Sequence, residues 1–160
     1  MTRQSAGLLL YRFAANGGVE VLIGHPGGPL FARRDEGVWS VPKGEYGPGE
    51  EPLAAAAREY TEELGQVPPS SERISLGEVR QAGGKRVVVW AVAGDFDPAE
   101  LSSNLFEMEW PPKSKQIGRF PEIDRVEWFS PERARAKLNA AQAPFVDRLL
   151  DAVAARPPAE

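Results

Sequence analysis

The sequence predicts an α+β fold in which helices flank both faces of a mixed β-sheet, an α/β/α sandwich. Short apolar runs separated by glycine-rich turns recur along the chain, which is typical of strands. Other segments carry apolar residues three and four positions apart, which is typical of helices. A length of 160 residues, 42% of them hydrophobic, suits one domain that folds unaided. We expect that domain over residues 1–155 and a disordered tail over 156–160.

The N-terminal part predicts a β-hairpin followed by a loop and a third strand. Residues 6–13 and 19–25 are apolar runs joined by an Asn-Gly-Gly turn, whose residues readily take positive φ angles. Residues 26–37 are rich in glycine, proline and charge, so we expect a loop there. The apolar residues 38–41 predict a short strand after it.

The next part predicts an irregular segment and then a helix. Residues 43–51 contain too many glycines and prolines for regular structure. A helix is expected from Pro52, which suits a first turn, to Leu64, with Gly65 as its C-terminal cap. Its apolar stripe, which can pack on a sheet, consists of Leu53, Ala57, Tyr60 and Leu64.

The C-terminal half predicts more strands and two further helices. Residues 74–80 and 86–94 form a second expected hairpin, and residues 124–129 a further strand. Ser130 is the expected N-cap of a helix that runs to about residue 138. A last helix is expected from Pro144, with an apolar face that repeats every four residues.

Composition and charge exclude several classes of function. The chain has no cysteine, so it has no disulfide and no thiolate metal site. The longest apolar run, Val87–Ala93, is too short to span a bilayer. A net charge of −4 argues against stable binding to nucleic acid or to an anionic membrane. We expect a cytoplasmic protein that is a monomer or a homodimer.

Three glutamates crowd one face of the expected central helix. Glu59, Glu62 and Glu63 stand at i, i+3 and i+4, and small Ala55 beneath them leaves room for a ligand. Like charges at this spacing cost about 0.2–0.5 kcal/mol, and each carboxylate in the last helical turn costs about 0.3–1 kcal/mol. A divalent cation such as Mg²⁺ would compensate. The alternative is a solvated, glutamate-rich helix face.

The surrounding spacing extends this cluster into a longer motif. In chain order its specified positions are Gly44, Glu50, Arg58, Glu59, Tyr60, Glu62, Glu63 and Gly65. This pattern resembles the Nudix box, the signature of hydrolases that cleave nucleoside diphosphates linked to another group. Tyr60 is larger than the usual aliphatic residue, and Gln66 is polar where an aliphatic residue is common. Neither departure changes a charged position.

The resemblance implies a role for each charged residue of the motif. It implies that the three glutamates bind Mg²⁺, with Mn²⁺ as a substitute, and that Glu59 is a possible base. It implies that Arg58 orients Glu59, that Glu50 supports the metal site and that the backbone carbonyl of Lys43 adds a ligand. The chemistry agrees, because a divalent cation neutralises a diphosphate and activates water, and a carboxylate can accept the proton.

An additional acidic ligand is expected outside the motif. Glu122 lies six residues before Trp128, a spacing similar to that of MutT-type enzymes, in which such a glutamate reaches the metal. The alternative is a solvent-exposed loop glutamate. Glu107 and Glu109 compete for the same role, because a long loop could bring them over the site.

Substrate contacts are expected from loops on either side of the motif. Basic side chains neutralise phosphates, and aromatic side chains stack on a base. A solvated surface role is the alternative for each basic residue. The candidates for substrate contact are Phe31, Arg33, Arg34, Lys43, Trp110, Lys113, Lys115 and Arg119.

The function we expect is Mg²⁺-dependent hydrolysis of a phosphoanhydride bond in a nucleoside polyphosphate. Residues 37–65 resemble diadenosine tetraphosphate hydrolases and MutT-type enzymes, so an NTP, a dNTP or a dinucleoside polyphosphate is the expected substrate. The alternatives are a Nudix-fold module that binds a nucleotide without cleaving it, and an enzyme for ADP-ribose, a nucleotide sugar or capped RNA. Residues 80–83 lack the usual ADP-ribose and polyphosphate markers, so the substrate stays open.

Overall fold

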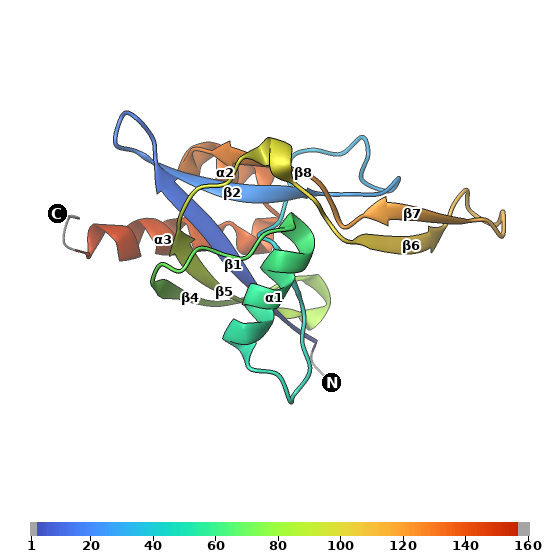
Figure 1. Ribbon diagram of the computed structural model, residues 1–160, viewed down its shortest axis with the longest axis horizontal. Helices are drawn as coiled ribbons and strands as arrows, with labels where there is room; N and C mark the ends of the chain where they lie inside the picture. Colours follow the sequence, from blue (N-terminus) through green and yellow to red (C-terminus); the bar gives the residue numbers. More distant parts are fainter. Residues whose placement is uncertain (1–2, 157–160) are drawn as a thin grey trace.

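A mixed sheet runs through the centre of the computed structural model, which describes residues 3–156 (Figure 1). Its strand order is β4-β5-β1-β2-β8, and β3 adds to β1. Two further strands form a separate hairpin. The strands are β1 (Gln4–Phe13), β2 (Val19–Pro26), β3 (Lys43–Glu45), β4 (Arg73–Arg80), β5 (Arg86–Ala93), β6 (Leu105–Glu109), β7 (Ile117–Pro121) and β8 (Ile123–Phe129). The helices are α1 (Pro52–Leu64), α2 (Pro131–Lys137) and α3 (Pro144–Ala154), with 3₁₀ turns η1 (Ala82–Gly84), η2 (Pro98–Glu100) and η3 (Ala140–Gln142).

Strand β1 is the centre of the sheet and is buried on both faces from Ser5 to Tyr11. It pairs in parallel with β5 along one edge. Along the other edge it pairs antiparallel with β2 near its C-terminal end and with β3 near its N-terminal end. A Cβ on Gly7 would lie 2.5 Å from the Pro42 carbonyl oxygen, so this close approach needs glycine. Strands β2 and β3 thus share one edge of β1, and β3 lies beside α1.

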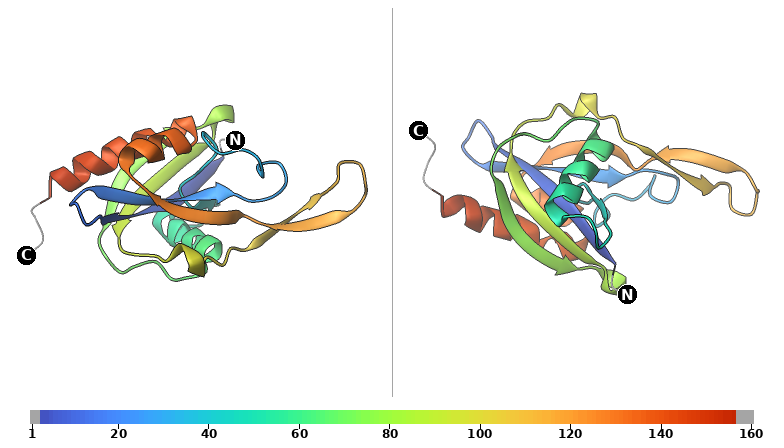
Figure 2. Two further views of the ribbon diagram at one scale, coloured as in Figure 1. Left: turned by 90° about the horizontal axis from the view of Figure 1, so that it is seen from above. Right: turned by 60° about the horizontal axis from the view of Figure 1, so that its bottom comes forward.

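The two faces of the sheet carry separate hydrophobic clusters, which confirms the predicted sandwich. Alternate residues of β1 point to opposite faces, so Leu8 and Leu10 join the cluster under α1 while Leu9 and Tyr11 join the other. Helices α2 and α3 cover that second face, as Figure 2 shows. Burial on both faces explains why β1 reads as one continuous apolar run rather than as an alternating strand.

Helix α1 begins and ends where the sequence predicts. Pro52 occupies its first turn, and Gly65 caps it with a left-handed φ of 83°. Tyr60 and Leu64 are buried against the sheet. The alignment of this apolar stripe turns the glutamates toward β3.

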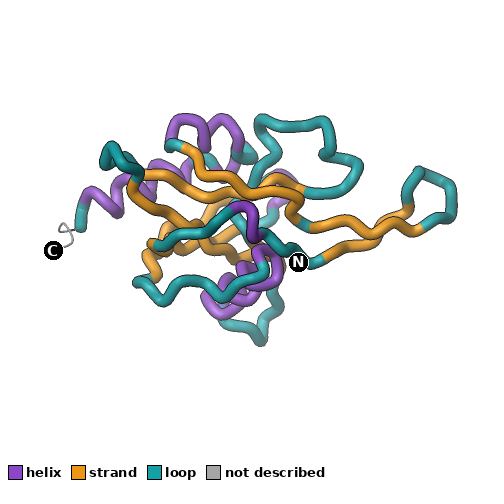
Figure 3. The backbone as a smooth tube through the Cα atoms, turned by 45° about the horizontal axis from the view of Figure 1, so that its top comes forward, coloured by secondary structure: helices purple, strands orange, loops and turns teal. Residues whose placement is uncertain are grey.

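Three segments differ from the sequence-based expectations. Residues 38–41 form only isolated bridges, at Trp39 and Ser40, because the segment leaves the β2 edge after one contact and turns to α2. Residues 43–45, expected to be irregular, form β3. The region between β5 and β8, expected to be a loop, contains the β6–β7 hairpin, which projects from the sandwich (Figure 3).

The chain ends add little to the fold. Arg156, the first residue of the expected tail, forms an ion pair with Glu72 at 3.0 Å. The rest of that expectation, residues 157–160, lies outside the described residues. Within residues 3–156, no helix combines the length and the hydropathy that a bilayer crossing would need.

Candidate functional site

A cleft of about 510 Å³ opens between α1, β3 and the junction of β7 with β8. Five glutamates and two lysines line it, together with small, polar and apolar residues. The lining residues are Gly24, Pro26, Ser40, Val41, Lys43, Gly44, Glu45, Glu59, Glu62, Glu63, Lys85, Asn104, Glu122 and Ile123, and Glu45 completes the acidic set. We call this space the carboxylate cleft. It lies where the sequence motif predicts a site.

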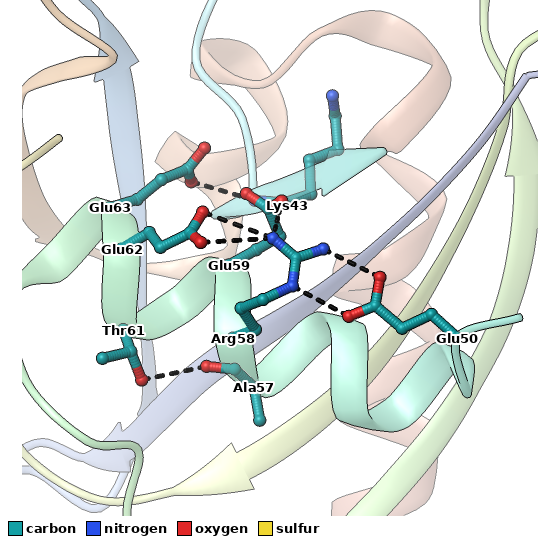
Figure 4. Close-up of polar contacts among 8 residues, drawn as sticks. All are labelled: Lys43, Glu50, Ala57, Arg58, Glu59, Thr61, Glu62 and Glu63. Carbon is teal, nitrogen blue, oxygen red and sulfur yellow. Dashed lines mark hydrogen bonds and ion pairs between the residues drawn. The ribbon is translucent and has the colours of Figure 1, made fainter. Parts of the chain in front are cut away.

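Two of the motif glutamates are buried in the wall of the carboxylate cleft. Glu59 is 9% exposed and Glu63 is 8% exposed, which is unusual for ionisable side chains. The backbone N–H of Lys43 donates a hydrogen bond to Glu63 Oε2 at 3.1 Å (Figure 4). A Cβ on Gly44 would lie 2.0 Å from the carboxyl carbon of Glu59, so only glycine fits there. Strand β3 therefore forms a cradle for both carboxylates.

Arg58 organises the remaining acidic side chains. Its Nε and Nη2 donate to the two oxygens of Glu50 at 2.8 and 3.0 Å, a bidentate geometry that only a guanidinium offers. Its Nη1 donates to Glu59 at 2.9 Å and to Glu62 at 3.3 Å (Figure 4). The Arg58 hydrogen bonds lower the pKa of Glu50. Arg58 thus holds Glu59, as the resemblance implies, and Glu50 holds Arg58.

The positive charge near the two buried acids does not offset the effect of their burial. Burial raises the pKa of Glu63 to about 8, and the neighbouring charge of Glu59 adds to this effect. Burial also raises the pKa of Glu59, followed by repulsion from Glu62. Both groups are therefore costly to ionise until a cation approaches them. The unfavourable electrostatics of these two carboxylates favour the binding of a metal ion.

The donor chemistry of the carboxylate cleft fits Mg²⁺ or Mn²⁺. Hard divalent cations take carboxylate and carbonyl oxygens, and this cleft offers both. Within residues 3–156, however, no three Asp, Glu or His side chains converge into a ready-made metal cluster. The reason is visible in the hydrogen bonds, since Arg58 holds Glu59 and Glu62 while the Lys43 N–H holds Glu63. The residues fit a metal, and their side chains have to turn to bind it.

Glu122 is the acidic residue outside the motif that reaches this cleft. It is anchored through its backbone, because its N–H donates to the Asn104 carbonyl at 2.9 Å and its carbonyl accepts from Gly27 at 3.1 Å. Its competitors are occupied elsewhere. Glu107 pairs with Arg119 at 3.1 Å, and Glu109 accepts the N–H groups at the tip of the β6–β7 hairpin.

Two lysines, Lys43 and Lys85, also line the carboxylate cleft. Burial lowers the pKa of Lys43 to about 8, and the adjacent charge of Lys85 lowers it further. Lys85, which follows a Gly-Gly turn before β5, was not among the expected site residues. It comes near Lys43 only because β1 pairs with β5 as well as with β3. A Gly-Gly-Lys turn alone would not have revealed it.

A second cleft of about 320 Å³ adjoins the first and shares Pro26, Ser40 and Lys43 with it. Two of the expected substrate residues, Phe31 and Arg34, line this space, whereas Arg33 lines neither cleft. Three polar residues of this cleft were not expected from the sequence, because they come from two segments far apart in the chain, the turn after β4 and the η3 segment. They are Gln81, Asn139 and Gln142.

Four other candidates for substrate contact lie on the β6–β7 hairpin and line neither cleft. Strand pairing sets Arg119 opposite Glu107, to which it binds. The backbone N–H groups of Lys113 and Lys115 bind Glu109 at the hairpin tip. Trp110 lies at the same tip. We leave these four residues out of the proposed site.

Comparisons with known proteins agree with this geometry. The profile of the NUDIX domain matches residues 1–149. No curated protein matches the chain. Among solved structures, a Caenorhabditis elegans Ap4A hydrolase in a binary complex is 22% identical, with a TM-score of 0.65 and coverage of 97% of this chain and 100% of that chain.

Two other solved structures share the same fold. The NUDIX domain of Shewanella oneidensis NrtR, in complex with ADP ribose, is 14% identical, with a TM-score of 0.63 and coverage of 96% of this chain and 89% of that chain. A MutT protein from Methanosarcina mazei is 18% identical, with a TM-score of 0.55 and coverage of 97% and 96%. The profile match, which spans most of the chain, is decisive. The chain belongs to the Nudix hydrolase family, whose enzymes act on phosphoanhydride bonds.

Proposed function

We propose that this protein is a Mg²⁺-dependent pyrophosphohydrolase that cleaves a phosphoanhydride bond of a nucleoside polyphosphate. The candidate substrates are an NTP, a dNTP or a dinucleoside polyphosphate such as diadenosine tetraphosphate. The observation that carries the proposal is the carboxylate cleft, whose lining combines four glutamates, Glu59, Glu62, Glu63 and Glu122, with two lysines. The carboxylates can bind a metal that also binds the substrate phosphates. The lysines can neutralise phosphate charge, and this combination suits hydrolysis of a phosphoanhydride bond.

Each residue has a distinct proposed role. Glu59, Glu62, Glu63 and Glu122, with the backbone carbonyl of Lys43, would hold Mg²⁺ or its substitute Mn²⁺. When bound, the metal neutralises phosphate oxygens and activates water for attack. Arg58 orients Glu59, and Glu50 keeps the Arg58 guanidinium in its bidentate position. Glu50 supports the site from outside, because it does not line the cleft.

The reaction requires one bond to form and one to break. The oxygen of a water molecule bonds to phosphorus, and the anhydride P–O bond breaks to release one phosphate-containing fragment. A carboxylate of the cleft accepts the proton that the water loses, and Glu59 is our candidate because Arg58 fixes its position. Lys43 and Lys85 lie where they can stabilise the charge on the departing phosphate.

The other substrates of the family stay as alternatives for the same cleft. The NrtR domain with its bound ADP ribose makes ADP ribose one of these alternatives. The alternative that is not an enzyme is a module that binds a nucleotide without hydrolysing it. The complete set of acidic residues in the motif disfavours this alternative. We keep the cytoplasm as the proposed compartment, since the chain has no cysteine that would require an oxidising one. A monomer or a homodimer is compatible with this function.

A hydrolysis panel tests the proposal. The purified protein is incubated with Mg²⁺ or Mn²⁺ and with NTPs, dNTPs, dinucleoside polyphosphates, ADP-ribose and nucleotide sugars, and products are identified by chromatography. We expect metal-dependent cleavage of at least one nucleoside polyphosphate at a kcat/KM above that for ADP-ribose or a nucleotide sugar. Preferred cleavage of ADP-ribose would replace the substrate class, and no cleavage of any compound would reject the activity.

A further inference from the structure

The second cleft has the chemistry of a site that recognises a nucleobase. We call it the amide cleft, after Gln81, Asn139 and Gln142, which line it together with Phe31 and Arg34. It shares Lys43 with the carboxylate cleft, so a nucleotide whose phosphates lie at the carboxylates can extend its base into it. Its volume of about 320 Å³ lies within the range of small-molecule pockets.

The orientation of the Gln142 amide is fixed by its hydrogen bonds. Gln142 is 1% exposed, and its Oε1 accepts a hydrogen bond from the backbone N–H of Val41 at 2.9 Å. A backbone N–H can only donate, so this contact identifies the oxygen of the amide. Its nitrogen therefore donates, to Ser40 Oγ at 3.0 Å and to Gln81 Oε1 at 2.8 Å. Gln142 is fully used inside the protein.

These hydrogen bonds also determine which group of the Gln81 side-chain amide a ligand can meet. Its oxygen is taken by Gln142, so its NH₂ group is the end that a ligand can meet. Asn139 is similar, because its Oδ1 accepts from the Ala141 N–H at 3.0 Å and its NH₂ group is left over. Neither NH₂ group has a hydrogen-bond partner among residues 3–156. The amide cleft thus presents donors rather than acceptors.

Phe31 and Arg34 add an aromatic surface and another donor. The guanidinium carbon of Arg34 lies 5.7 Å from the Phe31 ring centroid, and in the described part of the chain no carboxylate pairs with it. Buried His25 holds this loop in place, because its Nε2 lies 2.7 Å from the Arg34 carbonyl oxygen. A flat ring can stack on such a surface while its edge meets the amides.

We propose that the amide cleft binds the base of the substrate and selects a 6-oxo purine, guanine or hypoxanthine, over adenine. The inference rests on the proposed nucleotide hydrolysis. The O6 and N7 atoms of a 6-oxo purine are acceptors that match the NH₂ groups of Gln81 and Asn139, whereas the 6-amino group of adenine would set a donor against a donor. A donor set against a donor forfeits the hydrogen bond that the 6-oxo group makes.

The first test compares kcat/KM for GTP, ITP and ATP. ITP keeps the oxygen at position 6 and lacks the 2-amino group of GTP, so it isolates the 6-position. We expect GTP and ITP each to exceed ATP by at least about tenfold, which corresponds to one hydrogen bond of average strength. Equal values for the three nucleotides, or a preference for ATP, would overturn the inference.

The second test reverses the hydrogen bonding of one residue. In Gln81→Glu, one side-chain oxygen still accepts from Gln142, while the group that meets the ligand changes from a donor to an acceptor. We expect the GTP-to-ATP ratio of kcat/KM to fall at least about tenfold. Asn139→Asp keeps its acceptor for Ala141 in the same way and is the second variant if Gln81→Glu does not fold. Gln116→Glu makes the same change of charge at an exposed position outside both clefts and should leave the ratio unchanged.

The outcomes separate this inference from the proposed function. A protein that hydrolyses nucleotides but shows the same ratio in Gln81→Glu and in the unaltered chain refutes base selection by the amide cleft and leaves the activity standing. If no nucleotide is hydrolysed, calorimetry with non-hydrolysable GTP and ATP analogues measures the same preference as a ratio of Kd values. Equal Kd values would then reject the inference as well.

Discussion

Gly44 determines how closely β3 can approach α1, because its Cα lies against the carboxylate of Glu59. An added Cβ would fall 2.0 to 2.3 Å from the three carboxyl atoms, far inside van der Waals contact. Gly44→Ala should therefore displace Glu59 and weaken metal-dependent activity by about 10- to 100-fold, the usual effect of disturbing a residue that positions a metal ligand. Activity assays over a Mg²⁺ titration measure this effect.

Gly47→Ala is the matched control for Gly44→Ala. Gly47 lies in the same glycine-rich segment, and a Cβ there would meet no atom within 4 Å. Its activity and its Mg²⁺ dependence should equal those of the unaltered protein. If both alanine variants behave alike, the close packing of Gly44 against Glu59 is unimportant for function.

Arg58 is the second residue whose geometry is specific. Arg58→Lys keeps the charge but cannot bind Glu50 with two parallel hydrogen bonds while it also reaches Glu59. We expect kcat to fall about 10- to 100-fold and the apparent Mg²⁺ affinity to fall with it. Arg3→Lys is the control, because Arg3 forms an exposed ion pair with Glu45. The same exchange there should change kcat by less than about twofold. Full activity of Arg58→Lys would show that its charge alone suffices.

Among the elements, η3 links the C-terminal helices to the strand that enters the site. Gln142, its last residue, accepts from the Val41 N–H and donates to Ser40, just before Lys43. Gln142→Ala would leave the buried Val41 N–H without its acceptor, which costs about 1–3 kcal/mol of unfolding free energy. Urea unfolding measures this loss.

Exposed Gln66, whose side chain pairs with Glu100, is the control for the Gln142 variant. Gln66→Ala should change the unfolding free energy by no more than about 0.5 kcal/mol. An equally small change for Gln142→Ala would mean that the amide network does not support the segment before Lys43.

Elements with strong local signals could be predicted from the sequence, and those made by distant pairing could not. Helix α1 carries its own proline start, apolar stripe and glycine cap, so its bounds follow from local physics. Strand β3 consists of only three residues, Lys-Gly-Glu, so nothing local favours a strand. It exists because the edge of β1 is available to it. The β6–β7 hairpin was likewise not predicted, because the prolines and lysines at its tip favour a loop.

The same distinction holds for the site. Arg58 and the last three glutamates of the motif lie within one helix, so their spacing alone places them together. Gln81 and Lys85 come from the turn between β4 and β5, and Gln142 comes from η3, so only the fold brings them to the two clefts. Glu122 is an intermediate case. It lies far from the motif in the chain, but its spacing to Trp128 predicted that it belongs to the site. Local periodicity therefore predicts the chemistry better than it predicts the substrate contacts.

At the scale of the whole molecule, the site couples metal binding to stability. Buried Glu59 and Glu63 destabilise the metal-free protein when they are ionised, and a bound cation relieves this. Mg²⁺ at about 100 times its Kd should add about 2.7 kcal/mol, which corresponds to a rise in Tm of roughly 5–10 °C for a chain of this size. Differential scanning fluorimetry, with NaCl of equal ionic strength as the control, measures the shift. A rise that NaCl reproduces would argue against a specific site.

The most direct test of the central claim is the Mg²⁺-dependent turnover of Glu63→Gln beside that of Glu51→Gln. Glu63 is buried in the carboxylate cleft, whereas Glu51 is exposed just before α1 and outside that cleft, so the same change is made at two places. The metal-site account predicts that Glu63→Gln loses at least about 100-fold in kcat/KM for the best substrate of the panel. It predicts full activity for Glu51→Gln. Unchanged activity and unchanged Mg²⁺ dependence in folded Glu63→Gln would contradict the account.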